Sequence, residues 1–122
     1  MTAGRRMEPD DLASFALSLP AVEERETWDH PTFRVRNKMF LTLAGDGSTA
    51  TLKATPADQT ALIAADPGTY RVAAYVGRHG WVTVALDRID QDDLRELVVD
   101  AWRQVAPRSV AIAYDQRQRK RR

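Results

Sequence analysis

The chain has no cysteine and only two histidines among its 122 residues. The absence of cysteine excludes a disulfide framework, a thiolate metal site and a thiol nucleophile. The two histidines form no HxH or HExxH spacing, so the conceivable metal ligands are His30, His79 and Asp29. We therefore expect neither a metal site nor a cofactor.

Long apolar runs are also missing. No stretch approaches the roughly 20 apolar residues that span a bilayer, and the N-terminal segment lacks the apolar stretch of a signal peptide. A cytoplasmic protein is therefore expected. The length fits one domain and is short for two. The hydrophobic fraction of 43% and the charged fraction of 29% are typical of a globular chain.

Motifs for catalysis are absent as well. There is no GxSxG elbow, and the Gly45–Ser48 turn lacks the lysine and the strand-to-helix setting of a phosphate-binding loop. No serine has a histidine near it in the sequence: the serines are Ser14, Ser18, Ser48 and Ser109. We expect no catalytic residues and a protein that is not an enzyme.

Charge is unevenly distributed along the chain. Residues 8–113 hold 11 lysines and arginines against 16 acidic residues, whereas most of the remaining basic residues lie close to the two termini. Within this body, residues 31–86 are the basic part, with six bases and three acids. The location of charge is therefore more informative than the net charge of +1.

The spacing of apolar residues predicts helices and strands. Apolar residues at helical spacing predict helices over 9–19, 56–65 and 90–105, with Pro9, Pro56 and Asp90 close to their starts. Alternation predicts a short strand near 24–27 and further strands over 32–36, 38–43, 49–54, 70–76 and 81–86. In the 38–43 strand we expect Met39, Leu41 and Leu43 to face the core.

These elements predict an α+β fold. An alternating strand has one buried and one solvated face, and two long amphipathic helices can cover the same face. The expected architecture is a two-layer sandwich, an antiparallel sheet of about five to six strands with helices on one face. We expect a flexible tail over 1–7, one domain over 8–114 and a basic tail over 115–122.

The sheet face that the helices leave open is predicted to carry bases, threonines and aromatic rings. Bases suit phosphates and flat rings suit nucleic-acid bases, so this face predicts a nucleic-acid surface. A solvated sheet face has a similar composition, and this alternative stays open. The candidate binding residues are Arg34, Arg36, Lys53, Arg71, Arg78, Phe40, Tyr75 and Trp81.

Two loops and the acidic segments offer other candidates. Trp28, His30, Arg78 and His79 are predicted to line a pocket for a small anionic ligand, with Gly77–Gly80 either as a nest of backbone amides or as a plain turn. Metal binding of the frataxin kind is a further alternative. Its ligands would come from Glu8, Asp10, Asp11, Glu23, Glu24 and Glu26.

Several sequence blocks carry a resemblance to a known family. They are Ala16–Glu24, Trp28 with His30–Val35, Lys53–Pro56, Ala64–Pro67 and Tyr75–Val82. In these blocks, which span roughly residues 8–108, the chain resembles the MmcQ/YjbR family. The resemblance implies a fold like that of CyaY and frataxin, and a DNA-binding protein with a double-wing form of attachment. It brings no catalytic residues.

We therefore expect a non-enzymatic protein that binds nucleic acid through the open sheet face and the arginine-rich tail. A small-molecule or protein interaction module that uses loops 28–31 and 77–81 is the alternative. The chain is expected to be a monomer or a homodimer without a membrane partner.

Overall fold

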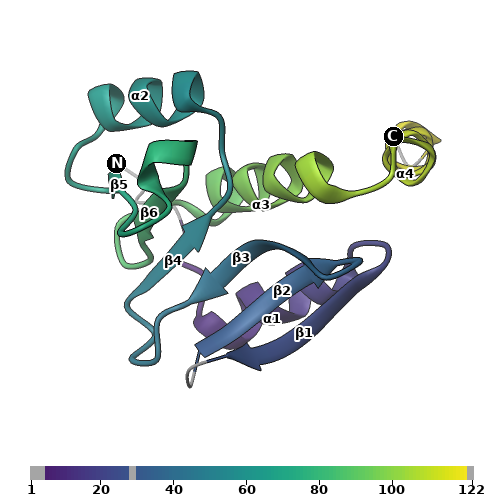
Figure 1. Cartoon of the computed structure of the whole chain (residues 1–122), viewed down its shortest axis with the longest axis horizontal. Coiled ribbons are helices and arrows are strands. Elements are labelled where there is room, and N and C mark those ends of the chain that lie inside the picture. The colour runs from purple at the N-terminus through teal and green to yellow at the C-terminus, as the bar shows by residue number, and fades with distance from the viewer. Residues whose placement is uncertain (1–4, 28–29, 121–122) are drawn as a thin grey trace.

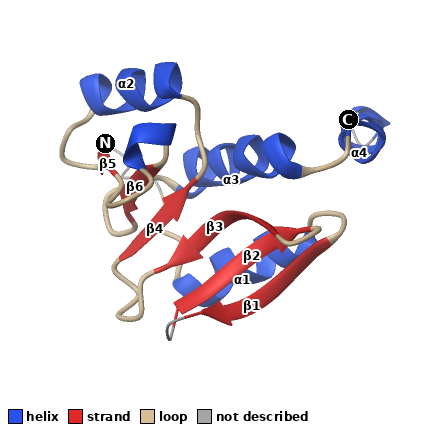
Figure 2. Ribbon diagram, viewed as in Figure 1, coloured by secondary structure: helices blue, strands red, loops and turns tan. Residues whose placement is uncertain are grey.

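The structure, a computed structural model, describes residues 5–27 and 30–120. Its elements are α1 (Pro9–Ser18), β1 (Val22–Thr27), β2 (His30–Val35), β3 (Lys38–Leu43), β4 (Thr49–Leu52), α2 (Pro56–Ala65), β5 (Tyr70–Val72), the 3-10 helix η1 (Gly77–His79), β6 (Val82–Ala85), α3 (Gln91–Val105) and α4 (Arg108–Lys120). The strands form one antiparallel sheet in the order β1-β2-β3-β4-β6-β5 (Figures 1 and 2).

Helices α1 and α3 pack on one face of the sheet, and α2 contacts the edge strand β5. The predicted α+β sandwich is confirmed, with six strands in its antiparallel sheet. None of the helices in the described part of the chain is long and apolar enough to cross a membrane.

Helices α2 and α3 begin where a capping side chain accepts a hydrogen bond from a free backbone amide. At α2 the Thr55 hydroxyl accepts a hydrogen bond from the Asp58 amide at 3.1 Å, and Pro56 occupies the first turn, where its missing N–H costs nothing. At α3 the Asp90 carboxylate accepts from the Asp92 amide at 3.0 Å. These local signals explain why the predicted helix starts agree with the structure.

One hydrophobic core lies between the sheet and helices α1 and α3. Its largest fully buried side chain is Trp102 of α3. The indole Nε1 of Trp102 donates a hydrogen bond to the Pro20 carbonyl at 3.0 Å, so the turn after α1 is tied to α3. A buried indole without a partner would lose about 1–3 kcal/mol, so this bond keeps the core closed.

A bulge in β3 changes the predicted phase of that strand. Phe33 pairs with Leu41 and Arg34 pairs with Met39, so Phe40 has no partner on β2. In such a bulge two consecutive side chains turn toward the same face. Phe40 is accordingly 0% exposed and belongs to the core, whereas Met39 is half-buried. The prediction that Phe40 lies on the open face was therefore wrong.

A row of threonines crosses the face of the sheet opposite α1 and α3. The strand register aligns Thr32, Thr42, Thr51 and Thr83, with Arg25 and Arg71 at the two ends of the row. We call the four threonines the threonine row. The Thr51 and Thr83 hydroxyl oxygens are 2.9 Å apart. Cross-strand hydrogen bonds of this kind stabilise a sheet face that no helix covers.

Residues 5–7 and 115–120 are more structured than the sequence suggests. Met7 is buried, and the Arg5 carbonyl accepts a hydrogen bond from the Gln91 amide at 2.7 Å, so residues 5–7 are not a free tail. At the other end, α4 continues to Lys120. The expected tail over 115–122 is therefore helical as far as Lys120.

A tight contact at Gly80 fixes the loop between β5 and β6. The backbone φ of Gly80 is +98°, which favours glycine over other residues. A Cβ atom there would lie 2.7 Å from the Ala54 carbonyl oxygen and equally close to the Pro56 nitrogen. Glycine thus allows η1 to rest directly on the turn between β4 and α2.

The buried position of Phe40 predicts the effect of a truncation. Phe40→Ala removes a fully buried ring, so we expect a loss of about 3–5 kcal/mol in the free energy of unfolding. Tyr75→Ala, at an exposed position, should change it by less than about 0.5 kcal/mol. Urea unfolding of both variants measures the difference. Equal stabilities would place the Phe40 ring in solvent and refute the bulge.

Gly80→Ala should also destabilise the protein. The added methyl group meets backbone atoms and the positive φ disfavours alanine, so we expect a loss of at least about 1 kcal/mol. Gly45→Ala is the matched control, because Gly45 is exposed and has no positive φ. Urea unfolding again gives the values. Identical losses at the two glycines would contradict the close approach at Gly80.

Candidate nucleic-acid interface

Cations from three segments lie at one end of the strands. β2 ends and β3 begins at this end, β4 ends there, and the β5–β6 loop closes it. The topology therefore places Arg34, Arg36, Lys53, Arg78 and also Lys38 on the same side of the threonine row. Lys38 was not among the predicted binding residues. In Figure 1 this is the upper end of the sheet.

Arg36 forms the tip of the β2–β3 hairpin. The backbone φ angles of Arg36 and Asn37 are +50° and +68°, the values of a type I′ turn. Asparagine tolerates this conformation, but arginine has no local reason to adopt it. Arg36 and Lys38 are both exposed, and the Arg34 guanidinium Nη1 donates to the Asn37 carbonyl at 3.3 Å. The hairpin thus presents cations at its tip.

Tyr75 has an exposed ring in a strained backbone. It lies in the loop between β5 and η1, its φ is +64°, and the residue is 98% exposed. Arg71 precedes it on β5 and Arg78 follows it on η1, and both are exposed. We call residues 71–78 the tyrosine loop. It places one exposed aromatic ring between two exposed arginine side chains along the chain.

Trp81 is not available for stacking, contrary to the prediction. It precedes Val82 of β6 and lies on the other face of the sheet from that core residue. Even so, only 6% of Trp81 is exposed. The Lys53 ammonium lies over the Trp81 ring at 5.6 Å from its centroid. Because of this cation–π contact, the Trp81 ring and the Lys53 ammonium are already engaged with each other.

The sheet face also carries an acid that the sequence analysis missed. Glu23 of β1 pairs with Arg34 of β2, so the two side chains lie on the same face. Arg25 lies on this face too, and its guanidinium donates to the Asn37 side-chain oxygen at 3.0 Å. The predicted face of bases, threonines and rings therefore also carries a carboxylate on β1.

The predicted pocket between loops 28–31 and 77–81 does not form. His30 begins β2 and lies on one side of the threonine row, whereas η1 with Arg78 and His79 lies on the other. β2 and β5 are also four strand spacings apart, roughly 19 Å. Figure 1 shows the start of β2 and the η1 segment at opposite ends of the sheet. Trp28, also placed in this pocket, lies outside the described residues.

Two backbone amides of the Gly77–Gly80 segment are already hydrogen-bonded within the protein. The His79 amide donates to the Val76 carbonyl and the Gly80 amide donates to the Gly77 carbonyl, both at 3.0 Å. Amides bonded in this way are not available to a phosphate. The Arg78 Nε atom donates to the His79 ring nitrogen Nε2 at 3.3 Å. What this segment offers a ligand is its side chains.

Part of the acidic segments gathers at one recess, and the residues described there form no metal site. Asp10 of α1 and Glu24 and Glu26 of β1 line one shallow recess. Within residues 5–27 and 30–120, no group of three or more histidine or acidic side chains could hold a metal ion. The frataxin-like alternative therefore has no geometric support.

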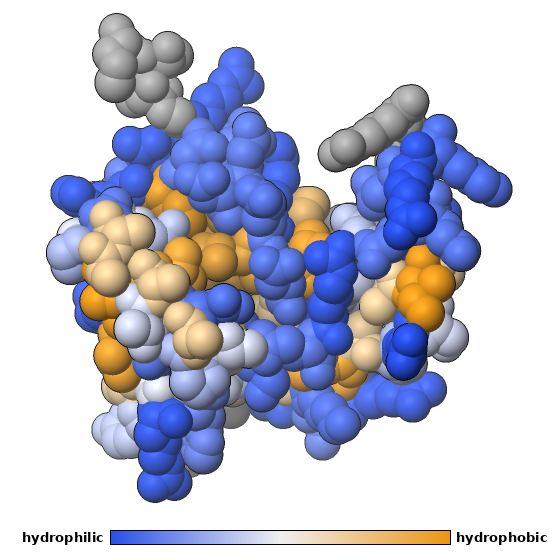
Figure 3. Space-filling view, turned by 90° about the horizontal axis from the view of Figure 1, so that it is seen from above, coloured by the Kyte–Doolittle hydropathy of each residue, from blue (hydrophilic) through white to orange (hydrophobic). Residues whose placement is uncertain are grey.

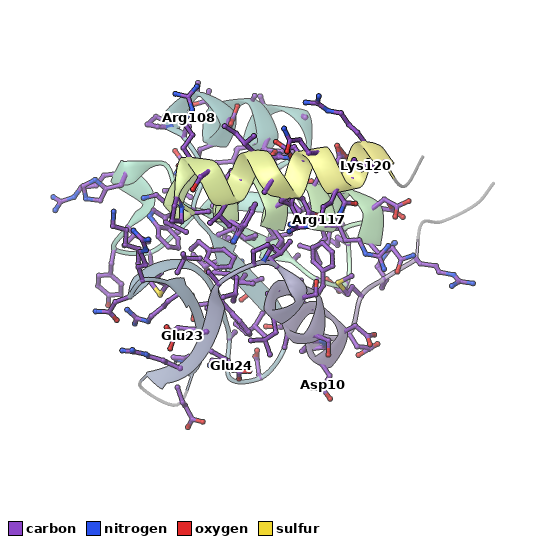
Figure 4. All side chains as sticks on the ribbon, turned by 90° about the vertical axis from the view of Figure 1, so that its right-hand side faces the viewer. Asp10, Glu23, Glu24, Arg108, Arg117 and Lys120 are labelled. Atoms are coloured by element: carbon purple, nitrogen blue, oxygen red, sulfur yellow. The ribbon has the colours of Figure 1, made fainter. Side chains whose placement is uncertain are left out.

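Helix α4 carries the remaining basic cluster. The Trp102 and Tyr114 rings meet edge to face, with centroids 5.2 Å apart, and Arg103 forms an ion pair with Asp115. The hydrogen bond that the Arg103 guanidinium donates to the Asp115 carboxylate raises the pKa of Arg103 above its usual value. Figure 4 shows Arg117 and Lys120 along this helix, far from Glu23 and Glu24 on β1.

Comparison with known proteins identifies the family. A family model described as YjbR matches residues 17–104. The crystal structure of Deinococcus radiodurans protein DR2400, a DUF419 domain, superposes with a TM-score of 0.73 at 24% identity, covering 80% of this chain and 77% of that one. No curated protein matches. Because the family model spans well over half of the sequence, the chain belongs to the YjbR family.

Proposed function

We propose that this protein binds nucleic acid through two projections at one end of its sheet, the β2–β3 hairpin tip and the tyrosine loop. In this proposal Arg36, Arg71 and Arg78 contact phosphates and Tyr75 stacks on a base. The proposal agrees with the DNA-binding role that resemblance to the MmcQ/YjbR family implies. The binding surface in this proposal consists of loops, whereas the sequence analysis predicted the flat open face of the sheet.

The observation that carries the proposal is that Tyr75 combines a left-handed backbone with an exposed ring. A residue other than glycine in the left-handed region costs about 1 kcal/mol or more. Burial of the ring does not offset this cost, because Tyr75 is 98% exposed. Folding therefore gives no reason for a tyrosine at this position. A base stacking on the ring would give one, since such stacking contributes about 1–3 kcal/mol.

The charges around the two projections support phosphate contacts. Arg36 repeats the strained backbone of Tyr75 at the tip of the hairpin, and its guanidinium is exposed. The hairpin and the tyrosine loop are about three strand spacings apart, roughly 14 Å. One nucleic-acid molecule can therefore contact both. Phosphate contacts of this kind give affinity without sequence preference.

We also propose that the protein acts by binding alone. Its two histidines lie at opposite ends of the sheet, so they cannot act on one substrate group. The Ser18 hydroxyl donates to the Phe15 carbonyl and the Ser48 hydroxyl donates to the Asp46 carboxylate. Neither serine hydroxyl is paired with a general base of the histidine kind.

Fluorescence anisotropy with labelled single-stranded and duplex DNA tests the proposal. Tyr75→Ala should weaken binding to single-stranded DNA about fivefold or more, because one stacked base is lost. The double substitution of Arg36 and Arg78 by alanine should make the log–log salt slope on duplex DNA shallower by about 1.8, the loss of two phosphate contacts.

The control variant has the same net charge as the double variant of Arg36 and Arg78. Substitution of Arg88 and Arg95 by alanine removes two cations from outside the projections, and this variant should retain the slope of the parent protein. Alanine at Arg117, Arg119 and Lys120 tests α4 without removing the helix that packs on Trp102. The proposal fails if low-salt titrations show no binding, or if only the α4 variant loses it.

A further inference from the structure

A groove opens in the helical layer between α2 and α3, apart from the two projections. Its volume is about 250 Å³. The lining comes from the end of β4, the start of β6 and the two helices: Leu52, Lys53, Ala54, Asp58, Ala61, Leu62, Val82, Leu97, Asp100 and Gln104. Tyr75 and the hairpin tip take no part in it, so the groove is a separate feature.

The groove exists because α2 packs loosely. No residue of α2 is fully buried, and Leu62 is the α2 side chain that reaches the core. On the groove side Ala61 provides only a methyl group, too small to fill the space toward α3. Leu97 of α3 therefore stays half-exposed. Figure 3, which looks at the molecule from above, shows an apolar surface surrounded by hydrophilic side chains.

The rim of the groove is acidic. Asp58 on α2 and Asp100 on α3 both line it. Asp58 has no ion pair within the described residues. Asp100 pairs with Arg103 at 3.1 Å, but both side chains are well exposed, so the pair is weak. Two carboxylates thus border one apolar cavity.

Lys53, the cation in the lining, forms no ion pair with either carboxylate. Lys53 has its ammonium group over the Trp81 ring, and Trp81 does not line the groove. The Lys53 backbone carbonyl is on the groove side, where it accepts a hydrogen bond from the Gln104 side chain at 3.2 Å. The two carboxylates therefore border an apolar floor, and the Lys53 ammonium is directed to the Trp81 ring.

We propose that this groove binds a small organic ammonium compound, with its apolar part on Leu62, Leu97 and Ala61 and its charged nitrogen between Asp58 and Asp100. The volume is below the roughly 300–1,000 Å³ of pockets for drug-sized ligands, so the occupant is a small amine. An anion would be repelled by the two carboxylates. A neutral apolar molecule would leave Asp58 without an ion-pair partner among the described residues.

An NMR titration of the full chain with three compounds of one shape tests this site. They are 2-phenylethylamine, 2-phenylethanol and 3-phenylpropionate, which differ in charge. The amine should bind about fivefold tighter than the alcohol, the gain expected from an exposed ion pair, and the carboxylate should bind weakest. The largest amide shifts should fall on Ala61, Leu62, Leu97 and Gln104.

Two pairs of variants separate the groove from nonspecific binding. Asp58→Asn should reduce amine affinity about threefold to fivefold, whereas Asp93→Asn, at the equivalent first-turn position of α3, should not change it. Ala61→Phe should fill the groove and abolish binding. Ala64→Phe, also exposed on α2 but outside the lining, should preserve it.

Three results would overturn the assignment. They are equal affinity for the amine and the alcohol, shifts centred on other residues, and undiminished amine binding by the Ala61→Phe variant. A lack of binding by all three compounds would also reject it. DNA binding is measured separately and uses other residues, so failure of either proposal leaves the other intact.

Discussion

The bulge at Phe40 determines which side chains the sheet presents to solvent. Because Phe40 has no partner on β2, Phe40 and Leu41 both enter the core, and Met39 turns to the face that carries Arg34. The end of β3 that leads into the hairpin is thereby shifted by one residue. Bulges increase local strand twist and redirect side chains. The position of the Arg36 tip, and with it the proposed binding end of the molecule, depends on this one extra residue.

The helices and strands could be predicted from the sequence, but the exposure of the candidate binding side chains could not. Capping at Thr55 and the alternation of apolar residues are local signals, so helix starts and the antiparallel sheet followed from them. Alternation cannot show an inserted residue, which is why Phe40 was placed outside. It also gives no information about what lies over a side chain, so the burial of Trp81 beneath Lys53 was missed. Strand order, which separates His30 from Arg78, requires long-range pairing that spacing does not specify.

Membership of the YjbR family and the match to DR2400 support the fold. The proposed function rests on the side chains of this chain. The fold places the candidate binding cations and a group of acidic side chains in different parts of the molecule. Cations gather on the hairpin and the tyrosine loop, and Asp10, Glu24 and Glu26 surround a recess on another part of the molecule. An approaching polyanion would be oriented by such a division before contact, because long-range attraction and repulsion act together.

The two edges of the sheet have a consequence for solution behaviour. A sheet with one face free of helices and two open edges is at risk of strand-to-strand aggregation. Here β1 is the longer edge, and four of its six residues are charged, while β5 has only three residues and ends in the tyrosine loop. An incoming strand would meet like charges at one side and too few backbone partners at the other. These two edges therefore allow one sheet face to stay free of helices with little risk of strand pairing between copies.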